Sequence, residues 1–520
     1  MTSIDDIKWD RYSHGMLQHN DNNIANMKGL LGETGCGFCL AKFRQVTMHL
    51  GTGMTHSCHH PAPHKIPLDE LKDNPSALFN TKQLKKARTQ MLNNERPSEC
   101  DYCWRVEDDG GTSDRTYKSL EPWASTKHDE IASLTGNENI YPSYLEVSFS
   151  NVCNMKCTYC GPEYSSKWVE ELKKDGPVPL LEETEHETHM HGQHNLDTLQ
   201  YKNRESNPYI DAFWEWLPGA MPNLEHLRIT GGEPLMSKET FKTIEWLIIN
   251  PNTELDFSIN TNMAVPEKLW NKFIDAISRL RDANAVRKIT IFTSVEGWGE
   301  RAEYARTGLD FELLKERVEQ VAAMDNIRIN IMSAFNIFSV TSFDTMLKWV
   351  HELKIKFNVN SNLTSFEDKT GFKADKNVDH IERRRRTPAH ELKIGLDIPY
   401  LRHPEHLDVH FCTHQLLEDY LFPTMNYMAS ACVNTEWNNP SGFESIEFNK
   451  FKRIVMHRAF FNKKNDPDRD SDLDIVRNRA RFYDFVTQMD KRRGTDFLTT
   501  FPEMQEFYEV CHAAKETLSQ

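Results

Sequence analysis

The chain has 520 residues, a formal net charge of −15, 38% hydrophobic residues and 27% charged residues, which predicts a soluble globular protein of two or three domains. The acidic balance disfavours a general nucleic-acid or anionic-membrane surface, since both attract clustered Lys and Arg. The N-terminus lacks an apolar run behind a basic start, and no stretch reaches the roughly 18 apolar residues of a membrane span. We therefore expect a cytoplasmic protein with no membrane partner.

Cysteines gather in the first third of the chain, which holds eight of the eleven. Disulfides are disfavoured in a reducing compartment, so this clustering indicates metal binding or redox chemistry. Cys39 and Cys58 come first, with Cys36 as a neighbour, and a C-x2-C pair, Cys100 and Cys103, follows a predicted helix over 84–93. Two separated pairs can converge on one centre, either a tetrathiolate zinc ion or a four-iron cluster.

A second cysteine group follows a predicted strand over 144–150. Cys153, Cys157 and Cys160 have C-x3-C-x2-C spacing. A structural zinc ion takes four protein ligands, whereas three thiolates on a four-iron cluster leave one iron open. The spacing therefore favours a cluster at the end of a strand over a zinc site or a chance grouping.

The next strand, predicted over 224–230, leads into a glycine-rich turn. Gly231-Gly232-Glu233-Pro234 follows it directly, and Ser237 is a suitable N-cap for a helix. Glycines permit close approach of the backbone to a ligand, so this turn is a candidate binding loop.

Further strands are predicted over 254–264, 287–297 and 326–336, with a sixth over 356–365, and helices over 266–281, 311–324 and 343–353 lie between them. Six such units predict an α/β fold, an open, parallel, partial (β/α)6 barrel. Polar residues close two of these strands, namely Ser258, Asn260, Asn262, Ser294 and Glu296.

The cysteine triplet, with Tyr159 before its third Cys, and the downstream GGEP turn resemble the radical S-adenosylmethionine (radical SAM) superfamily. The resemblance implies that Cys153, Cys157 and Cys160 hold a SAM-binding [4Fe–4S] cluster. It further implies cofactor contacts from Tyr159, Gly231, Gly232, Glu233 and Pro234, with GGEP at the methionine amine. By the same resemblance, Ser258, Asn260, Asn262, Ser294 and Glu296 are candidates for the ribose and carboxylate of SAM.

The earlier cysteines resemble the twitch domain, a shortened SPASM module, in which C-x(9–15)-G-x4-C is matched by Cys39, Gly53 and Cys58. Cys100 and Cys103 match its later half. The resemblance implies a second, auxiliary [4Fe–4S] cluster held by Cys39, Cys58, Cys100 and Cys103, with a zinc ribbon as the alternative. The module usually follows the barrel, whereas here it precedes it, and Cys36 is a competing ligand.

The activity implied by the resemblance is reductive cleavage of SAM to a 5′-deoxyadenosyl radical, which takes a hydrogen atom from a peptide or protein side chain or a small metabolite. A flavodoxin or ferredoxin would supply the electron. One alternative is a nucleotide- or RNA-modifying enzyme, which the net acidity disfavours. A non-catalytic iron–sulfur or zinc scaffold is the other.

These patterns predict a tail (1–30), the twitch-like module (31–120), a linker (121–140), the radical SAM core (141–365, insertion 161–222) and a mostly helical extension (366–520). Three features are more typical of structural or solvated positions than of functional ones, although a metal site, a phosphate contact and a hydrogen-atom donor are the respective alternatives. They are the histidines of the insertion (His186, His189, His191, His194), the run Arg383–Arg386, and Cys412 with Cys432.

Overall fold

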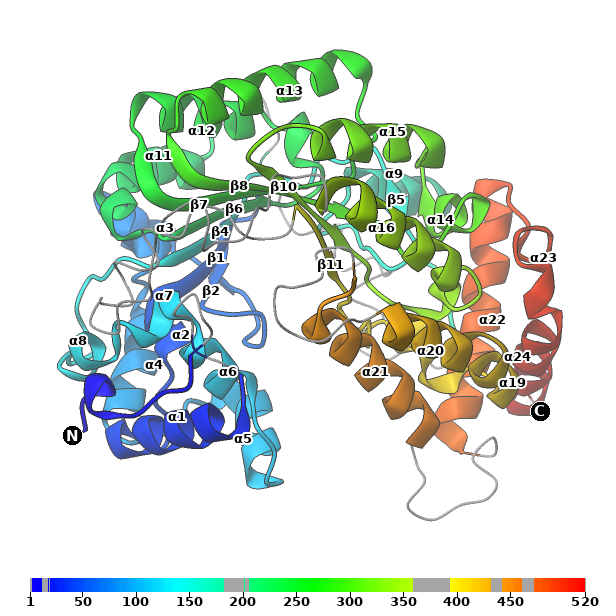
Figure 1. The fold of residues 1–520 in the computed structure, drawn as a ribbon, viewed down its shortest axis with the longest axis horizontal. Helices are drawn as coiled ribbons and strands as arrows, with labels where there is room; N and C mark the ends of the chain where they lie inside the picture. Colours follow the sequence, from blue (N-terminus) through cyan, green and yellow to red (C-terminus); the bar gives the residue numbers. More distant parts are fainter. Residues whose placement is uncertain are drawn as a thin grey trace.

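The computed structural model describes residues 2–11, 17, 19–181, 201, 205–358, 393–431, 442–460 and 472–519. It is a mixed α/β structure built on a nine-stranded sheet (Figure 1). In spatial order the strands are β11 (Ile394–Asp397), β10 (Ile327–Met332), β8 (Val286–Ser294), β7 (Asn252–Thr261), β6 (His226–Thr230), β4 (Tyr144–Ser148), β1 (Gln45–His49), β2 (Met54–His56) and β3 (His64–Lys65).

The seven strands β11, β10, β8, β7, β6, β4 and β1 are each parallel to their neighbours in this series. β2 and β3 continue the sheet beyond β1 as antiparallel strands. The carboxyl ends of parallel strands share one edge of a sheet, where open α/β folds bind their ligands. The loops that follow β4, β6, β7 and β8 therefore leave the same edge, and they carry the predicted cysteine triplet, the GGEP turn and the polar strand ends.

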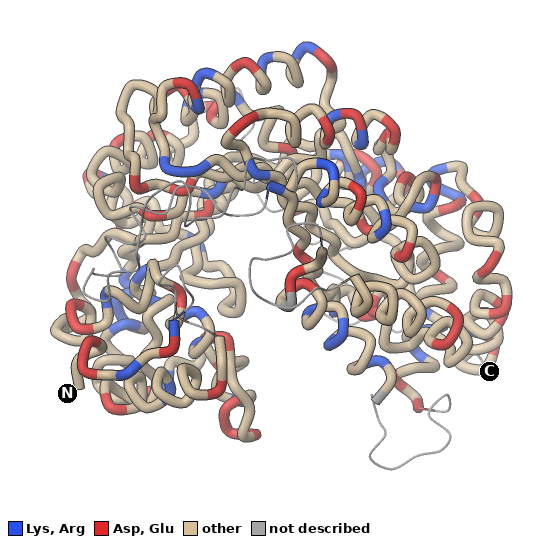
Figure 2. The backbone as a smooth tube through the Cα atoms, viewed as in Figure 1, with Lys and Arg blue, Asp and Glu red and all other residues tan. Residues whose placement is uncertain are grey.

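One face of the sheet is apolar and covered by helices. Leu227 and Ile229 of β6 are fully buried, as are Phe257 and Ile259 of β7, while the residues that alternate with them are half-buried and mostly polar. Figure 1 shows the covering helices along the outer side of the sheet: α11 (Pro208–Ala220), α12 (Lys238–Ile249), α13 (Glu267–Asp282), α15 (Phe311–Ala322) and α16 (Phe343–Asn358). Figure 2 shows Lys and Arg interspersed with Asp and Glu along these helices.

Helices before β4 pack beneath one end of the sheet (Figure 1). They include α1 (Asp21–Thr34), α2 (Leu40–Arg44), α3 (Leu68–Leu71), α4 (Lys82–Leu92), α5 (Asp101–Asp108), α6 (Asp114–Leu120), α7 (Pro122–Ser125) and α8 (His128–Ala132). Their own small core contains Phe38, Phe43, Trp104 and Trp123. β1 belongs to this segment and pairs with β4. The predicted twitch-like module (31–120) therefore contributes a strand to the main sheet.

Helices of the C-terminal part pack at the opposite end, beside β11 and the short α14 (Glu300–Ala305) (Figure 1). They are α19 (His414–Leu416), α20 (Phe422–Ala431), α21 (Ser445–Phe460), α22 (Leu473–Arg493), α23 (Phe497–Thr500) and α24 (Gln505–Leu518). β11 lies within the predicted extension but is a strand of the main sheet. The domain boundaries at 140 and 365 stay predictions.

The strand predicted over 356–365 is wrong in its first three residues. Lys356, Phe357 and Asn358 form the end of α16, and 359–365 lie outside the described residues. The buried Asn358 side chain accepts a hydrogen bond from the Ile394 amide at 2.8 Å, which joins the helix end to β11. Among the described residues, the next strand parallel to β10 is β11.

Candidate functional site

The cysteine triplet lies in the loop between β4 and α9 (Ser166–Asp175), and backbone hydrogen bonds hold this loop in place. Cys157 is on the short strand β5 (Lys156–Cys157), which pairs with β9 (Arg306–Thr307). The Thr158 amide donates to Ala305 at 2.8 Å, and the Cys160 amide donates to the Cys157 carbonyl at 3.0 Å. Cys157 is buried and the other two cysteines are half-buried, so all three thiols sit on one constrained loop.

Burial makes these thiols hard to ionise. It raises the pKa of Cys153 to about 12 and raises the pKa values of Cys157 and Cys160 above the ordinary range. The nearby Arg306 guanidinium acts in the opposite direction on all three. Metal ligation requires the thiolate form, which the positive charge of Arg306 stabilises.

Tyr159 and Glu296, both predicted as cofactor-binding residues, meet at Arg306. The Tyr159 hydroxyl donates to Glu296 Oε1 at 2.7 Å, and Arg306 Nη1 donates to both carboxylate oxygens at 3.1 and 3.2 Å. Arg306 also contacts the Tyr159 hydroxyl. Burial opposes the charge on Arg306, but Cys157, Tyr159 and Glu296 outweigh it and raise its pKa. Sequence reasoning missed Arg306, because only the β5–β9 pairing brings it opposite Cys157.

The glycines of the GGEP turn pack against the start of the cysteine loop. Gly231 has a φ of 126°, and a Cβ there would lie 2.7 Å from Ser148 Oγ. A Cβ on Gly232 would lie 2.5 Å from the Val152 carbonyl oxygen. The Gly232 and Glu233 amides donate to Ser150 and Val152 carbonyls at 3.2 and 2.8 Å. The close approach expected from these glycines is thus made to the cysteine loop.

Glu233 ties the turn to the end of β7. Its carboxylate accepts from the Asn262 amide at 2.7 Å, the Thr261 hydroxyl at 2.8 Å and the Leu235 amide at 3.0 Å. Burial raises the pKa of Glu233 to about 7, and these three donors oppose that rise. Asn262 Nδ2 in turn donates to Asn154 Oδ1 at 2.8 Å, inside the cysteine loop. Pro234 begins a short 3-10 turn before Ser237, which caps α12 as predicted.

The polar face of the sheet carries the remaining predicted contacts. Ser258, Asn260 and Ser294 are half-buried. Asn260 Oδ1 accepts from Arg228 Nε at 2.9 Å, and the Arg228 guanidinium lies 4.1 Å from the centre of the Phe292 ring. Sequence reasoning missed Arg228, although its alternation with Leu227 and Ile229 in β6 was a usable signal. This face therefore offers a cation together with hydrogen-bonding groups.

The four cysteines predicted for the auxiliary centre line one cavity. Cys39 immediately precedes α2, Cys58 follows β2, Cys100 immediately precedes α5, and Cys103 lies in the first turn of α5. Cys36 is exposed, and its thiol contacts the Asn94 carbonyl oxygen at 3.1 Å instead of lining the cavity. The fold therefore brings two distant cysteine pairs together.

Positive side chains surround these four thiols. Lys42, Arg115 and Lys118 line the same cavity. Burial raises the pKa of Cys100 to about 12, and Lys42 opposes this rise. Burial also disfavours the charge on Lys42, but Cys100 and the ion pair with Glu99 outweigh it and raise the Lys42 pKa. The cavity is therefore suited to a metal centre that the cysteines bind as thiolates.

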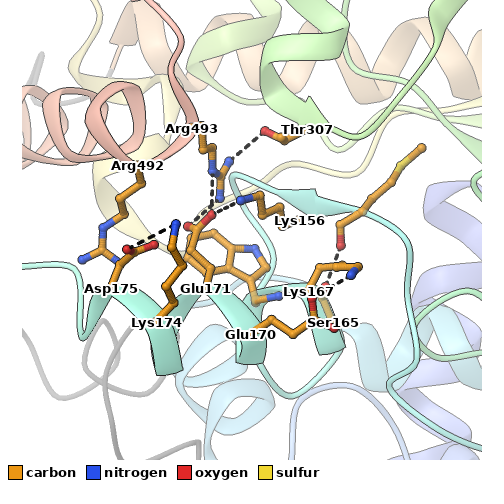
Figure 3. Close-up of polar contacts among 12 residues, drawn as sticks. Lys156, Ser165, Lys167, Glu170, Glu171, Lys174, Asp175, Thr307, Arg492 and Arg493 are labelled. Atoms are coloured by element: carbon orange, nitrogen blue, oxygen red, sulfur yellow. Dashed lines mark hydrogen bonds and ion pairs between the residues drawn. The ribbon is translucent and has the colours of Figure 1, made fainter.

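Helix α22 of the C-terminal part packs against α9 and β9, and Figure 3 shows its Arg493 pointing toward Glu171 and Thr307. Arg493 and Glu171 of α9 are both 2% exposed and lie 3.3 Å apart, and Glu171 also pairs with Lys156. Arg493 Nη1 donates to Thr307 of β9 at 3.1 Å. Its guanidinium lies 4.8 Å from the centre of the Trp168 ring, and Trp168 Nε1 donates to the Cys157 carbonyl at 2.8 Å. A segment more than 300 residues away thus positions Cys157.

Replacing Arg493 by methionine is expected to destabilise the protein by about 3 kcal/mol, because Glu171 would keep its buried charge without this partner. The free energy of unfolding in urea measures the loss. The double variant Arg493→Met/Glu171→Leu is expected to recover part of it, since it removes both charges. Arg492→Met is the matched control, because Arg492 bonds the Gly176 and Pro177 carbonyls and not Glu171. Equal losses in Arg492→Met and Arg493→Met would contradict this role.

Gly232→Ala is expected to destabilise the protein by about 3 kcal/mol and to weaken cluster retention, because the added Cβ meets backbone atoms of Asn151 and Val152. Thermal unfolding and iron content measure both effects. Gly29→Ala in α1 is the control, since a Cβ there meets nothing within 4 Å and alanine favours a helix by about 1 kcal/mol. Unchanged stability in Gly232→Ala would contradict the packing argument.

Several predicted features lie outside the described residues: His186, His189, His191, His194, Arg383–Arg386 and Cys432. Cys412 is fully buried in the core, and its thiol accepts from Arg458 Nε at 3.1 Å. Among the described residues, no helix has the length and apolar character needed to cross a membrane.

Comparison with known proteins finds a distant similarity over part of the chain. No family model matches the chain. Over 212 residues the chain is 26% identical to the GTP 3′,8-cyclase of Yersinia pestis, a stretch that covers 40% of this chain and 51% of that protein. The chain thus spans about half the length of the curated relative it matches. The similarity supports the radical SAM superfamily and leaves the substrate class open.

Proposed function

We propose that this protein is a radical SAM enzyme with an auxiliary metal centre. One observation carries the proposal: the GGEP turn is hydrogen-bonded to the cysteine loop, so that the two motifs form one unit at the carboxyl edge of the sheet. Cys153, Cys157 and Cys160 would hold the [4Fe–4S] cluster and leave one iron open for SAM. The chemistry supplied when both are bound is reductive cleavage of SAM to a 5′-deoxyadenosyl radical.

A buried donor supports the fit of an anionic group beside the triplet. Arg306 Nε is buried and has no hydrogen-bond partner in the described part of the chain, whereas Nη1 of the same guanidinium bonds Glu296. A buried N–H without a partner is costly, and an anionic ligand would satisfy it. Arg306 would stabilise the thiolates, while Glu296 and Tyr159 hold its guanidinium in place.

The thiols of the auxiliary cavity support a cluster over a single zinc ion. A tetrahedral zinc site with bonds of about 2.3 Å places its sulfur atoms about 3.8 Å apart. No three of Cys39, Cys58, Cys100 and Cys103, all of them described, have sulfur atoms within 4.8 Å of one another. A four-iron cluster binds each thiolate through a different iron and so accepts wider spacing. We therefore propose an auxiliary [4Fe–4S] cluster, with zinc as the alternative.

The substrate has two candidate classes. The twitch-like cysteines favour a peptide or protein side chain, or a small metabolite, as the substrate. A nucleotide is favoured by a different observation, the similarity to a protein named for GTP. Arg228 on the polar face of the sheet, held by Asn260 and Phe292, is a cation suited to an anionic group in either class.

An anaerobic assay tests the proposal. The full chain is reconstituted with iron and sulfide, reduced, and supplied with SAM, and 5′-deoxyadenosine and iron per chain are quantified. Formation of 5′-deoxyadenosine is expected, and its rise on addition of GTP or of a peptide pool would separate the substrate classes. No SAM cleavage with any reductant, with zinc at the triplet, would favour the scaffold.

A further inference from the structure

Two histidines and an aspartate lie together in the lining of the auxiliary cavity. His59 Nε2 lies 3.1 Å and His60 Nε2 lies 2.8 Å from Asp114 Oδ2. Their three ligand atoms all lie within 4.8 Å of one another, and in the described ranges no other group of three or more His, Cys, Asp or Glu residues does so. Imidazole and carboxylate together are ligands of divalent transition metals.

The separations between these atoms suit a metal coordination sphere. Metal bonds of about 2.0–2.1 Å place neighbouring ligand atoms about 2.9 Å apart in an octahedral site and about 3.4 Å apart in a tetrahedral one. The two N–O distances fall near this range, so an ion could replace the shared hydrogen bonds with small side-chain movements. Each imidazole would carry its proton on Nδ1, leaving Nε2 as the ligand atom.

The surroundings fix part of the group and leave the rest accessible. The His60 side chain is 15% exposed, and its ring stacks on Tyr102 with centroids 3.9 Å apart. His59 and Asp114 are 56% and 39% exposed, so an ion can enter and keep water as further ligands. His59 follows the cavity residue Cys58, and Asp114 begins α6, so an ion here would tie these two segments together.

We propose that His59, His60 and Asp114 form a second metal site, separate from the thiols, for a divalent transition metal such as Zn²⁺. Two nitrogen donors disfavour Ca²⁺ and Mg²⁺, which take oxygen ligands. The site stands on contacts among these three residues and does not depend on SAM chemistry. Its role is to fasten the loop after Cys58 to α6 at the edge of the cysteine cavity.

The test uses the full chain with its clusters reconstituted. One equivalent of Zn²⁺ is added anaerobically, unbound ion is removed by gel filtration, and zinc per chain and zinc-edge X-ray absorption are measured. About one zinc per chain is expected, with nitrogen or oxygen neighbours at about 2.0–2.1 Å. A sulfur shell at about 2.3 Å, or no retained zinc, would overturn the proposal.

Variants locate the ion. His59→Ala, at an exposed position, is expected to weaken zinc binding at least tenfold and to remove the rise in melting temperature that zinc gives the parent chain. His414→Ala is the matched control, because His414 is also exposed and lies 3.4 Å from a carboxylate, that of Glu418, but no third ligand joins this pair among the residues that the structure describes. Zinc affinity unchanged in His59→Ala, or equally weakened in His414→Ala, would overturn the assignment.

Discussion

Replacing Cys153, Cys157 and Cys160 together by alanine is expected to abolish 5′-deoxyadenosine formation and to lower the iron content from about eight to about four atoms per chain. The physical reason is that one constrained loop holds all three thiols beside Arg306, and that no other cysteine lies on this loop. Anaerobic reconstitution followed by iron analysis and chromatography of the SAM products measures both quantities.

The control for the triplet is Cys511→Ala. Cys511 is fully buried in α24, so its replacement tests the loss of a buried thiol without touching the loop. Iron content and SAM cleavage are expected to match those of the parent chain. SAM cleavage that persisted in the triple variant would show that the triplet does not hold the reactive cluster.

Cys100→Ala/Cys103→Ala is expected to remove about four irons per chain. The variant is expected to go on cleaving SAM but to lose turnover of the substrate. Both thiols are buried at the start of α5, and the variant takes away half of the proposed auxiliary ligands. The triplet loop is held by β9, α9 and α22, so its cluster is expected to persist. Iron per chain and 5′-deoxyadenosine formation report the two effects separately.

Cys36→Ala distinguishes the cavity ligands from their neighbour. Cys36 is exposed and does not line the cavity, so unchanged iron and activity are expected. Iron loss in Cys36→Ala would make Cys36 a ligand. A parent chain with about four irons and one bound zinc, with SAM cleavage intact, would instead assign the four cavity thiols to zinc.

Local sequence patterns predicted much of the chain. The strands predicted over 144–150, 224–230 and 287–297 are present as β4, β6 and β8, although β4 and β8 end earlier than predicted, and Ser237 caps α12. Such elements depend on residues close in sequence, whose burial and capping preferences agree with the fold. The cysteine spacing likewise predicted three thiols on one loop.

The sequence by itself thus determined the order of β4, β6, β7, β8 and β10, the candidate ligands and the turn that follows β6. Tertiary structure alone decided that β1 and β11 join the main sheet, that Cys39 and Cys58 meet Cys100 and Cys103 in one cavity, and that Arg306 and Arg493 flank the triplet loop. The physical reason is that each of these contacts joins segments far apart in the chain, which meet only when they pack together. No local periodicity records such a pairing, because its free energy arises only once both segments are buried together.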